Sequence, residues 1–216
     1  MTSAASRKAA ERQARRDYIL AAARRLFATK GADNTSMEDI AREADYTRRT
    51  LYSYFESRDE VCVMVLTDDL KVRWETQQKA IAHASTGLDK IINWGTSFYD
   101  FARANSHSMR LQYYMDFKGI DPRRISKGIF KAFEKINNEL AEGLREIFHL
   151  GIRDGSLRPD LNIDMSISQY LYTLRSILNR ALSPSYSFAS FDPDEYVKHY
   201  LDLFIRGIRN TKGITR

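Results

Sequence analysis

Four polar side chains of one short segment have the types that contact DNA bases. They are Arg48, Arg49, Thr50 and Ser53. Arginine is the commonest reader of guanine in the major groove, and short hydroxyls suit several bases. Leu51, Tyr54 and Phe55 recur between them at helical spacing, so an apolar face would turn inward and the polar residues outward. The pattern predicts a short helix that presents a base-reading surface.

A second short helix is predicted immediately before this one. Thr35 and Glu38 have the Thr-x-x-Glu spacing of a capping box, which starts a helix by satisfying its first backbone amides. The small Ala41 allows a close helix crossing, Asp45 begins the turn, and Thr47 is the expected N-cap of the reading helix. Two short helices at a tight turn indicate a helix-turn-helix, whose second helix enters the major groove.

The other reactive side chains show no catalytic arrangement. Four histidines, at 83, 107, 149 and 199, fall on separate predicted helices or at their ends. No Gly-x-Ser-x-Gly, His-Glu-x-x-His or phosphate-binding glycine loop is present. Cys62 is the only cysteine, which excludes an intrachain disulfide and a cysteine-based zinc cluster, and we expect it to be a buried apolar residue. We therefore expect no enzyme activity, no metal site and no cofactor.

The charge of the chain is concentrated at its N-terminus. Of the formal net charge of +6, residues 1–30 supply all, with eight Lys or Arg against two acids. A disordered basic arm can lie along phosphates or enter the minor groove. The candidate arm residues are Arg7, Lys8, Arg12, Arg15 and Arg16. A solvated leader and an N-terminal extension of the first helix are open alternatives.

Helical spacing recurs along the rest of the 216 residues, and no strand pattern has comparable strength. We expect a first helix from 17 to 30, ended by Gly31, and a long helix that starts at a second capping box formed by Ser57 and Glu60. On this long helix the apolar residues should face inward and the charged ones should face water; they are Val61, Val65, Leu66 and Val72, and Asp68, Asp69 and Lys71. Further helices are predicted over 88–105, 106–117, from Asp121-Pro122 to 151, over 167–181 and from 192 to 208, with a Ser-rich loop at 183–190. The fold class is all-α. No apolar run reaches eighteen residues and no secretory signal is present, so we expect a cytoplasmic protein.

A larger set of residues carries a family resemblance. It comprises Ile19, Ala22, Ala23, Leu26, Phe27, Gly31, Thr35, Ser36, Ile40, Ala41, Leu51, Tyr52, Tyr54, Phe55 and Ser57. Over residues 17–61 the chain resembles the TetR-type family of bacterial transcriptional regulators. It departs from the family pattern at Asp45 and Arg49, where Gly is frequent, and at Arg58, where Lys is usual. Asp tolerates a left-handed backbone better than most residues, so the turn should persist.

The resemblance implies about nine helices and a homodimeric, ligand-responsive repressor of a palindromic operator. Residues 1–16 would be the basic arm, 17–60 the DNA-binding domain, and 61–216 an effector-binding and dimerisation domain. Phosphate contacts would come from Thr35, Ser36, Thr47, Tyr52 and Arg58. The last two helices would pair across a two-fold axis through Leu171, Leu174, Leu178, Leu201, Phe204 and Ile208.

Aromatic residues concentrate between Trp94 and Phe117, and most of them are expected to belong to the core. The family resemblance implies that the helical body also encloses an effector cavity, which some of these residues would line. The candidate lining residues are Trp94, Phe98, Tyr99, His107, Tyr113, Tyr114, Phe117 and Phe133. Such linings are typical of pockets between helices and favour an apolar or amphipathic small molecule. Asp100 and Asp116 would instead suit a cationic ligand through charge and cation–π attraction.

Two other functions fit parts of the pattern. A helical protein that binds a small molecule or a protein partner could carry a reader that has lost DNA affinity, and Asp45 is the one hint of this. Binding to a membrane surface through the basic arm lacks an apolar face before Tyr18. Salt-dependent binding to genomic DNA separates the repressor from both.

Overall fold

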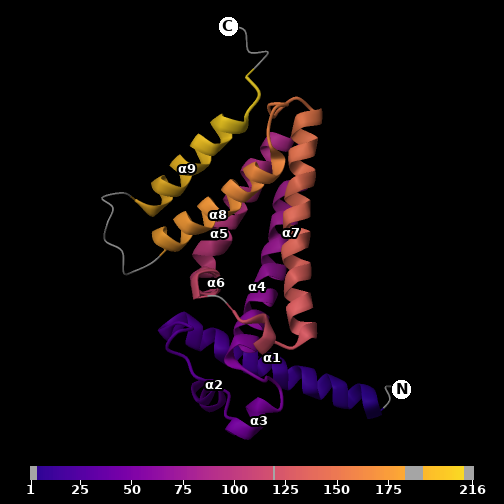
Figure 1. Ribbon diagram of the computed structural model, residues 1–216, viewed down its shortest axis with the longest axis vertical. Helices are drawn as coiled ribbons and strands as arrows, with labels where there is room; N and C mark the ends of the chain where they lie inside the picture. Colours follow the sequence, from indigo (N-terminus) through magenta and orange to yellow (C-terminus); the bar gives the residue numbers. More distant parts are fainter. Residues whose placement is uncertain (1–3, 119, 183–191, 212–216) are drawn as a thin grey trace. The chain divides into compact units, whose positions relative to one another are not determined.

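The computed structural model of the chain describes residues 4–118, 120–182 and 192–211. All regular elements in these ranges are helical, which confirms the all-α class and the expected nine α-helices (Figure 1). They are α1 (Ala4–Lys30), α2 (Met37–Glu43), α3 (Arg48–Tyr52), α4 (Arg58–Ile81), α5 (Gly87–Ala104), α6 (Ser106–Lys118), the 3-10 helix η1 (Pro122–Arg124), α7 (Lys127–Arg153), α8 (Ile163–Ala181) and α9 (Pro193–Ile208). None of the described helices is long and apolar enough to cross a membrane.

The chain divides into two compact units. The first contains Met1–Asp69 and Arg110–Glu134, and the second contains Leu70–Met109 and Lys135–Arg216. Helices α4, α6 and α7 each supply residues to both units. The first unit therefore includes the predicted DNA reader together with most of α6 and the beginning of α7.

The core of the first unit forms where the apolar faces of α1–α4 pack together. Its most completely buried members are Ile19, Ala22, Ala23, Phe27, Ile40, Leu51, Phe55, Val61 and Val65. The helical spacing read from the sequence placed all nine on inward faces. Cys62 is also fully buried, as expected, and burial raises the pKa of its thiol to about 12.

Helix α1 ends where the sequence predicted and begins earlier. Its last residue is Lys30, and Gly31 follows with φ of 79°, a left-handed conformation that ends helices at little cost for glycine. The helix starts at Ala4, well before the predicted start at Asp17. A disordered arm is therefore wrong for residues 4–16, and the alternative of an N-terminal helical extension is correct.

Helix α4 has a different register from the predicted one. Val72, expected to face inward, is 55% exposed, whereas Asp69, expected in water, is 7% exposed and pairs with Arg24 at 2.9 Å. The buried stripe continues through Leu66, Leu70, Arg73, Gln77 and Ile81. These positions are three or four residues apart and so share one face of the helix. Two of them are polar, which is why apolar spacing alone selected the wrong face.

The second capping box is only half formed. The Ser57 hydroxyl accepts the amide of Glu60, as predicted, at 3.2 Å. The buried Glu60 carboxylate accepts instead from the amides of Glu56, at 2.8 Å, and Ser126, at 2.6 Å. This carboxylate therefore joins the start of α4 to the segment before α7 within the first unit.

The second unit has one large apolar core. Its fully buried members include Ile91, Trp94, Phe98, Leu144, Phe148, Tyr170, Leu174, Leu178 and Val197, drawn from α5, α7, α8 and α9. A Cβ on Gly87 would lie 2.2 Å from the amide nitrogen of Gly151, so only glycine permits this close approach of α5 to α7. Trp74 of α4 packs over Gly143 of α7 in the same way. Helices α8 and α9 lie side by side (Figure 1).

Two helices begin at an Asp-Pro pair. Asp121 caps a helix that has Pro122 at its first position, as expected, but this is the short 3-10 helix η1, and α7 starts separately at Lys127. Asp192 and Pro193 begin α9 as predicted. The Ser-rich loop expected at 183–190 lies outside the described residues.

Candidate nucleic-acid interface

The turn between α2 and α3 contains the one described non-glycine residue with a left-handed backbone. Asp45 has φ of 53°, as its place in the family pattern indicated. The amide of Tyr46 donates to the Ala41 carbonyl at 2.9 Å, and the amide of Asp45 donates to that of Arg42 at 3.2 Å. Ala41 is 3% exposed beneath the crossing. The turn therefore forms with Asp in place of Gly.

Helix α3 begins at the predicted cap. The Thr47 hydroxyl accepts the amide of Thr50 at 3.1 Å, and the two hydroxyl oxygens lie 2.9 Å apart. Leu51 is fully buried and anchors the helix in the core of the first unit. Because Leu51 faces inward, Arg48 and Arg49 are held on the outer side at the start of the helix, where both are exposed.

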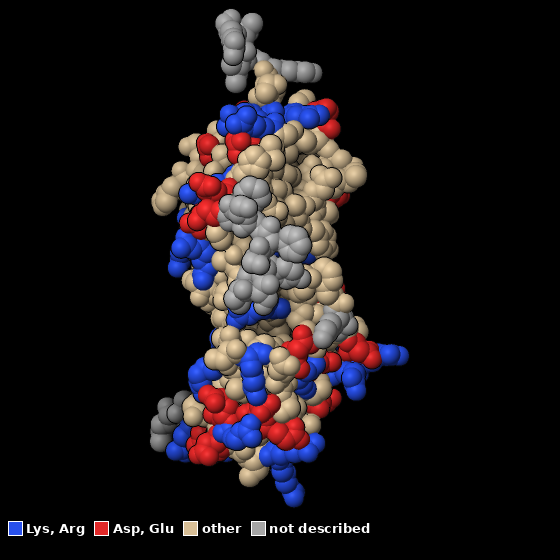
Figure 2. Space-filling view, turned by 90° about the vertical axis from the view of Figure 1, so that its left-hand side faces the viewer, with Lys and Arg blue, Asp and Glu red and all other residues tan. Residues whose placement is uncertain are grey.

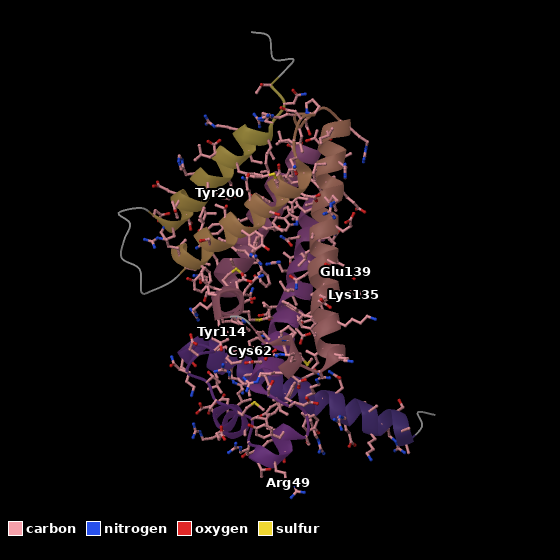
Figure 3. The ribbon with its side chains drawn as sticks, viewed as in Figure 1. Arg49, Cys62, Tyr114, Lys135, Glu139 and Tyr200 are labelled. Carbon is pink, nitrogen blue, oxygen red and sulfur yellow. The ribbon has the colours of Figure 1, made fainter. Side chains whose placement is uncertain are left out.

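The two arginines of α3 differ in their surroundings. Arg48 pairs with Glu38 of α2 at 2.7 Å, and its guanidinium lies 5.5 Å from the centre of the Tyr52 ring. Hydrogen bonding to Tyr52 and the charge of Glu38 raise the Arg48 pKa above its ordinary value. Arg49 makes no hydrogen bond or ion pair with any residue in the described ranges, and it extends away from the helices (Figure 3). Arg49 is thus the arginine of α3 with all of its donors available to DNA.

The two hydroxyl residues of the predicted reading set are partly engaged. The Ser53 hydroxyl donates to the Thr50 carbonyl at 2.6 Å, and the Ser53 carbonyl accepts from Arg12 at 3.2 Å. Each hydroxyl oxygen keeps a lone pair that can accept from a base. Arg49 and Ser53 are exposed on α3 and its C-cap, and Thr50 between them is half-buried.

Of the two predicted phosphate contacts at the start of α2, only Ser36 has an exposed side chain. The N-cap is Ser36, which is exposed and forms a reciprocal box with Asp39 at 3.1 and 2.9 Å. Donation from the Ser36 amide, followed by contacts with Lys30 and the Ser36 hydroxyl, lowers the pKa of Asp39. Thr35 is 1% exposed and its hydroxyl donates to the Gly31 carbonyl at 2.7 Å. The predicted capping and phosphate roles of Thr35 are therefore wrong, because its side chain faces the interior.

The predicted phosphate role of Arg58 does not fit its contacts either. Its guanidinium turns inward, donates to the Ala32 carbonyl at 3.2 Å and to the hydroxyl of Tyr114, and lies over the Tyr114 ring. Both partners belong to the first unit. Arg58 therefore joins α4 to α6. By contrast, Thr47 is exposed and Tyr52 is 42% exposed beside the reading face, where a phosphate could reach them.

The basic residues of α1 fall into two groups. Arg12 lies over the Tyr54 ring at 5.2 Å, and Arg16 lies over the Phe55 ring at 5.5 Å and contacts the Met64 sulfur. These two side chains pack on the helix-turn-helix instead of extending as an arm. Arg7, Lys8 and Arg15 are exposed and form no ion pair in the part of the chain that the structure describes.

Charge on the reader is largely neutralised by local ion pairs. Figure 2 shows basic and acidic residues interspersed over the surface formed by α1–α3. The pairs are Arg25–Glu43 at 2.8 Å, Lys30–Asp39 at 3.0 Å, Arg42–Asp39 at 2.5 Å and Arg48–Glu38 at 2.7 Å. Few basic side chains of the reader are therefore unpaired. Each exposed, unpaired one should contribute more to DNA affinity than a paired one.

The predicted effector residues are divided between the two compact units. Tyr113, Tyr114, Phe117 and Phe133 belong to the first unit, and Trp94, Phe98, Tyr99 and His107 to the second. Tyr113 and Phe117 are 40% and 71% exposed and stack on each other at 4.1 Å, so a pocket role for them is wrong. The Tyr99 hydroxyl donates to Asp194 of α9. Trp94 and Phe98 are fully buried in the apolar core of the second unit.

The suggestion of a cationic ligand loses its support. Asp100 and Asp116 are both exposed, so neither carboxylate lines a buried aromatic site. The polar residues that are buried in the second unit are of another kind. Arg73 and Gln77 of α4 are 4% and 0% exposed, and sequence reasoning missed both. The helical spacing of the buried face of α4 includes both positions. They could have been predicted as buried only by accepting polar residues on that face.

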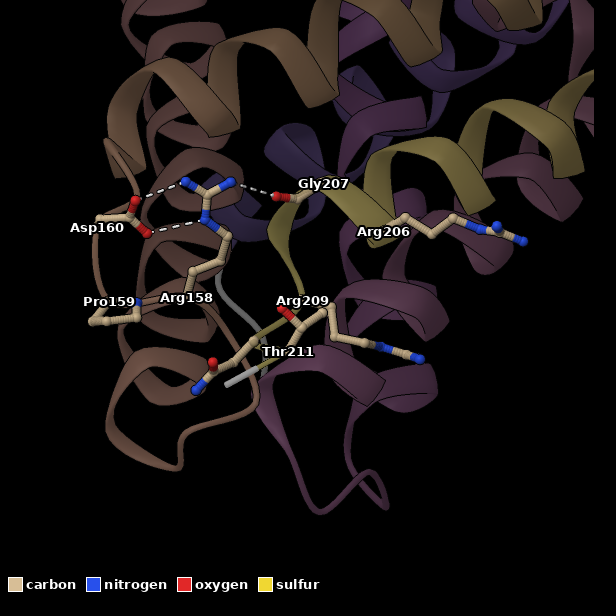
Figure 4. A pocket seen from close by; sticks show the side chains of 8 residues that line it. Arg158, Pro159, Asp160, Arg206, Gly207, Arg209 and Thr211 are labelled. Carbon is tan, nitrogen blue, oxygen red and sulfur yellow. Dashed lines mark hydrogen bonds and ion pairs between the residues drawn. The ribbon is translucent and has the colours of Figure 1, made fainter. Parts of the chain in front are cut away.

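A cavity of about 420 Å³ opens at the end of α9 (Figure 4). Its lining includes Arg158, Asp160, Arg206 and Arg209. Arg158 is held by Asp160 at 2.7 and 3.0 Å and donates to the Gly207 carbonyl at 3.2 Å. Arg206 pairs with Asp202 at 2.8 Å. None of the predicted effector residues lines this cavity.

The predicted dimer residues mostly face the core of their own chain. Leu174, Leu178 and Ile208 are at most 4% exposed, so a contact role for them is wrong. Leu171, Leu201 and Phe204 are half-buried against the same core. The exposed apolar side chains on α8 and α9 are Met165, Tyr172, Tyr196 and Leu203. Helical spacing identified the apolar residues of α8 and α9. It could not tell which of them pack in the core of the chain and which are exposed.

Comparison with known proteins finds a family profile and several relatives that are similar to this chain. Residues 19–63 match the profile described as "Bacterial regulatory proteins, tetR family". The chain is 26% identical over 200 residues to the HTH-type transcriptional repressor KstR2 of Mycolicibacterium smegmatis, covering 92% of this chain and 93% of that protein. It is 25% identical over 197 residues to KstR2 of Rhodococcus jostii, covering 90% and 91%.

Solved structures agree on the fold. The structure of the ketosteroid transcriptional regulator KstR2 of Mycobacterium tuberculosis superposes with a TM-score of 0.67 at 20% identity, over 90% of this chain and 95% of that one. The relatives of this chain that are named above are transcriptional repressors and not enzymes. Residues 19–63 therefore match the helix-turn-helix segment of bacterial regulatory proteins of the tetR family, and over most of its length the chain is similar to HTH-type transcriptional repressors.

Proposed function

We propose that the protein acts as a homodimer that binds a palindromic operator, with one α3 helix in each of two successive major grooves. The observation that carries this proposal is the position of Arg49, exposed and without a partner among the described residues, at the start of a capped and anchored α3. Thr50, Ser53 and Arg48 complete the base-reading set. Ser36, Thr47 and Tyr52, with Arg7, Lys8 and Arg15 of α1, would hold phosphates and set the register.

Dimerisation would use the outer faces of α8 and α9. Four large apolar side chains are exposed there, at 61% for Met165, 65% for Tyr172, 36% for Tyr196 and 55% for Leu203. Exposed apolar groups gathered on two adjacent helices favour association with a second copy, because an isologous interface places the same patch on both subunits. A two-fold symmetric operator follows from a two-fold symmetric dimer.

Release from DNA would be driven by a small effector. Residues 17–60 would read DNA and residues 61–216 would bind the effector and dimerise, in the cytoplasm. The relative from Mycobacterium tuberculosis is named a ketosteroid regulator, which supports an apolar or amphipathic effector. Such a molecule releases the operator only if it binds the DNA-free form more tightly, and a typical coupling of about 1–3 kcal/mol weakens operator binding roughly 5- to 150-fold.

The test is selection of binding sites from genomic fragments with the purified protein, followed by affinity measurements on the best site and on a shuffled duplex. We expect the protein to bind its best site at least about 10³-fold more tightly than the shuffled duplex, and the affinity to fall steeply with salt concentration. Equal, weak binding to both duplexes would favour the alternative of a helical binding protein whose reader has lost its function.

A further inference from the structure

The second unit contains a cluster of buried polar atoms without hydrogen-bond partners in the described structure. It comprises Nε and Nη1 of Arg73, Nε2 and Oε1 of Gln77, and Nε1 of Trp94. Arg73 and Gln77 lie one helical turn apart on the same face of α4. Arg73 lies 4.3 Å from the centre of the Phe98 ring, and Trp94 packs edge-on against the same ring at 5.6 Å. The Phe98 ring therefore joins the α4 and α5 parts of the cluster.

Arg73 is also a buried charge. It is 4% exposed, and no residue in the described ranges forms an ion pair with it. Burial, and then the positive charge of Arg175 on α8, lower its pKa to about 9, so it remains charged at neutral pH. The π face of the Phe98 ring offsets part of the free-energy cost of burying the Arg73 charge. The Nε and Nη1 donors of the guanidinium, which lie on two different edges, have no hydrogen-bond partner among the described residues.

The balance of donors and acceptors defines what would satisfy the cluster. Four of the five atoms are donors and one is an acceptor. A buried water can accept only two hydrogen bonds and cannot neutralise the charge of Arg73. A carboxylate offers about four lone-pair sites and a negative charge, and it matches the edge of a guanidinium in two parallel bonds. The cluster therefore favours an acceptor-rich anion.

The surroundings define the rest of the ligand. Phe98, Tyr170 and Leu174 belong to the apolar core around Trp94, and the Tyr170 hydroxyl is already used by the Ile91 carbonyl at 3.0 Å. We propose that the effector is an apolar molecule with one carboxylate, which Arg73 binds and to which Gln77 and Trp94 donate. This inference rests on the proposed effector response and assigns its ligand class. Because α4 is continuous from Arg58, a ligand at Arg73 acts on the helix that follows the reader.

The test uses the full chain without DNA and two matched probe pairs. Decanoate is compared with decan-1-ol, and cholate with its neutral methyl ester, by calorimetry and by Trp94 emission. We expect at least one carboxylate to bind at least tenfold more tightly than its neutral counterpart. Equal affinities within both pairs, or no binding of either carboxylate, would overturn the proposal.

Two variants locate the binding. Arg73→Met should lower carboxylate affinity at least tenfold and leave the neutral probe unchanged, whereas Arg209→Met, in the cavity of Figure 4, should bind like wild type. Loss of binding only in Arg209→Met would overturn the assignment. Without ligand, Arg73→Met should melt at the same or a higher temperature, because it removes a buried charge that has no counter-ion. A clear fall in melting temperature would show a structural cation and would also overturn it.

Operator affinity, measured on the same preparations, separates this inference from the proposed function. Ligand-free Arg73→Met should bind the operator as wild type does. Operator binding without carboxylate binding would overturn the inference alone. Carboxylate binding at Arg73 that leaves operator affinity unchanged would support the site and contradict effector-driven release.

Discussion

Replacing Arg49 by Ala should weaken binding to the best operator while leaving the fold intact. Arg49 is exposed and forms no hydrogen bond or ion pair with a described residue, so its removal leaves no buried cavity and breaks no ion pair. The whole effect should then fall on DNA. A bidentate arginine–guanine contact contributes about 1–3 kcal/mol of discrimination, which corresponds to roughly 5- to 150-fold in affinity. The loss should be confined to the operator and be nearly absent on shuffled DNA.

The matched control is Arg48→Ala. Arg48 has the same charge and lies on the same helix, but it is already paired with Glu38 at 2.7 Å. Arg48 must give up this ion pair to bind DNA, which offsets part of the affinity that it contributes. Arg48→Ala should therefore lower operator affinity less than Arg49→Ala does. Both variants should have equal effects on the charge of the protein, which isolates base reading from general electrostatics.

The assay is fluorescence anisotropy of labelled operator and shuffled duplexes at several salt concentrations, with melting temperatures measured in parallel. An equal loss on both duplexes for Arg49→Ala would show that Arg49 contacts phosphate. A larger loss for Arg48→Ala than for Arg49→Ala would refute the reasoning from the ion pair.

Three further changes test other parts of the structure. Replacing Arg7, Lys8 and Arg15 together by Ala should lower the slope of log affinity against log salt by about 0.9 for each phosphate that the variant no longer neutralises, with no change in melting temperature; an unchanged slope would show that this part of α1 does not touch DNA. Changing Tyr172 and Leu203 together to Glu should yield folded monomers in sedimentation, whereas Leu174→Glu, at a fully buried site, should unfold the chain at a cost of several kcal/mol; dimers of the double variant would exclude the proposed surface. Asp39→Asn should lower stability at neutral pH, and because the folded-state pKa of Asp39 lies below its unfolded value of 3.8, the difference from wild type should shrink as pH falls below 3.8; a difference that does not change with pH would contradict the capping role.

Local signals in the sequence predicted the reader well. Thr47, Asp45 and Leu51 lie within seven residues of one another, and each has a role set by its immediate neighbours: a cap, a left-handed turn and an anchor. The cap of α2 was off by one because Thr35 and Ser36 are both good caps, and only packing decides that Thr35 turns inward. Such a choice depends on contacts with Gly31, which spacing does not reveal.

Longer-range features were harder to predict. The buried stripe of α4 runs through Arg73 and Gln77, and a search for apolar residues selected Val72 on the opposite side. On α8, Leu174 and Tyr172 have similar apolarity, yet one is in the core and the other is exposed. The aromatic run from Trp94 to Phe117 begins with a fully buried side chain and ends with one that is 71% exposed, so aromatic character alone did not predict burial. In each case the deciding information is which helix packs on which face.

The proposed function requires a two-fold dimer that places two α3 helices on one operator. Hydroxyl-radical footprinting of the wild-type protein on its selected site tests this most directly. We expect two protected half-sites related by two-fold symmetry, with centres about one turn of DNA, roughly 34–36 Å, apart or a multiple of that distance. Protection of a single asymmetric half-site by a monomer, or uniform protection without sequence symmetry, would contradict it.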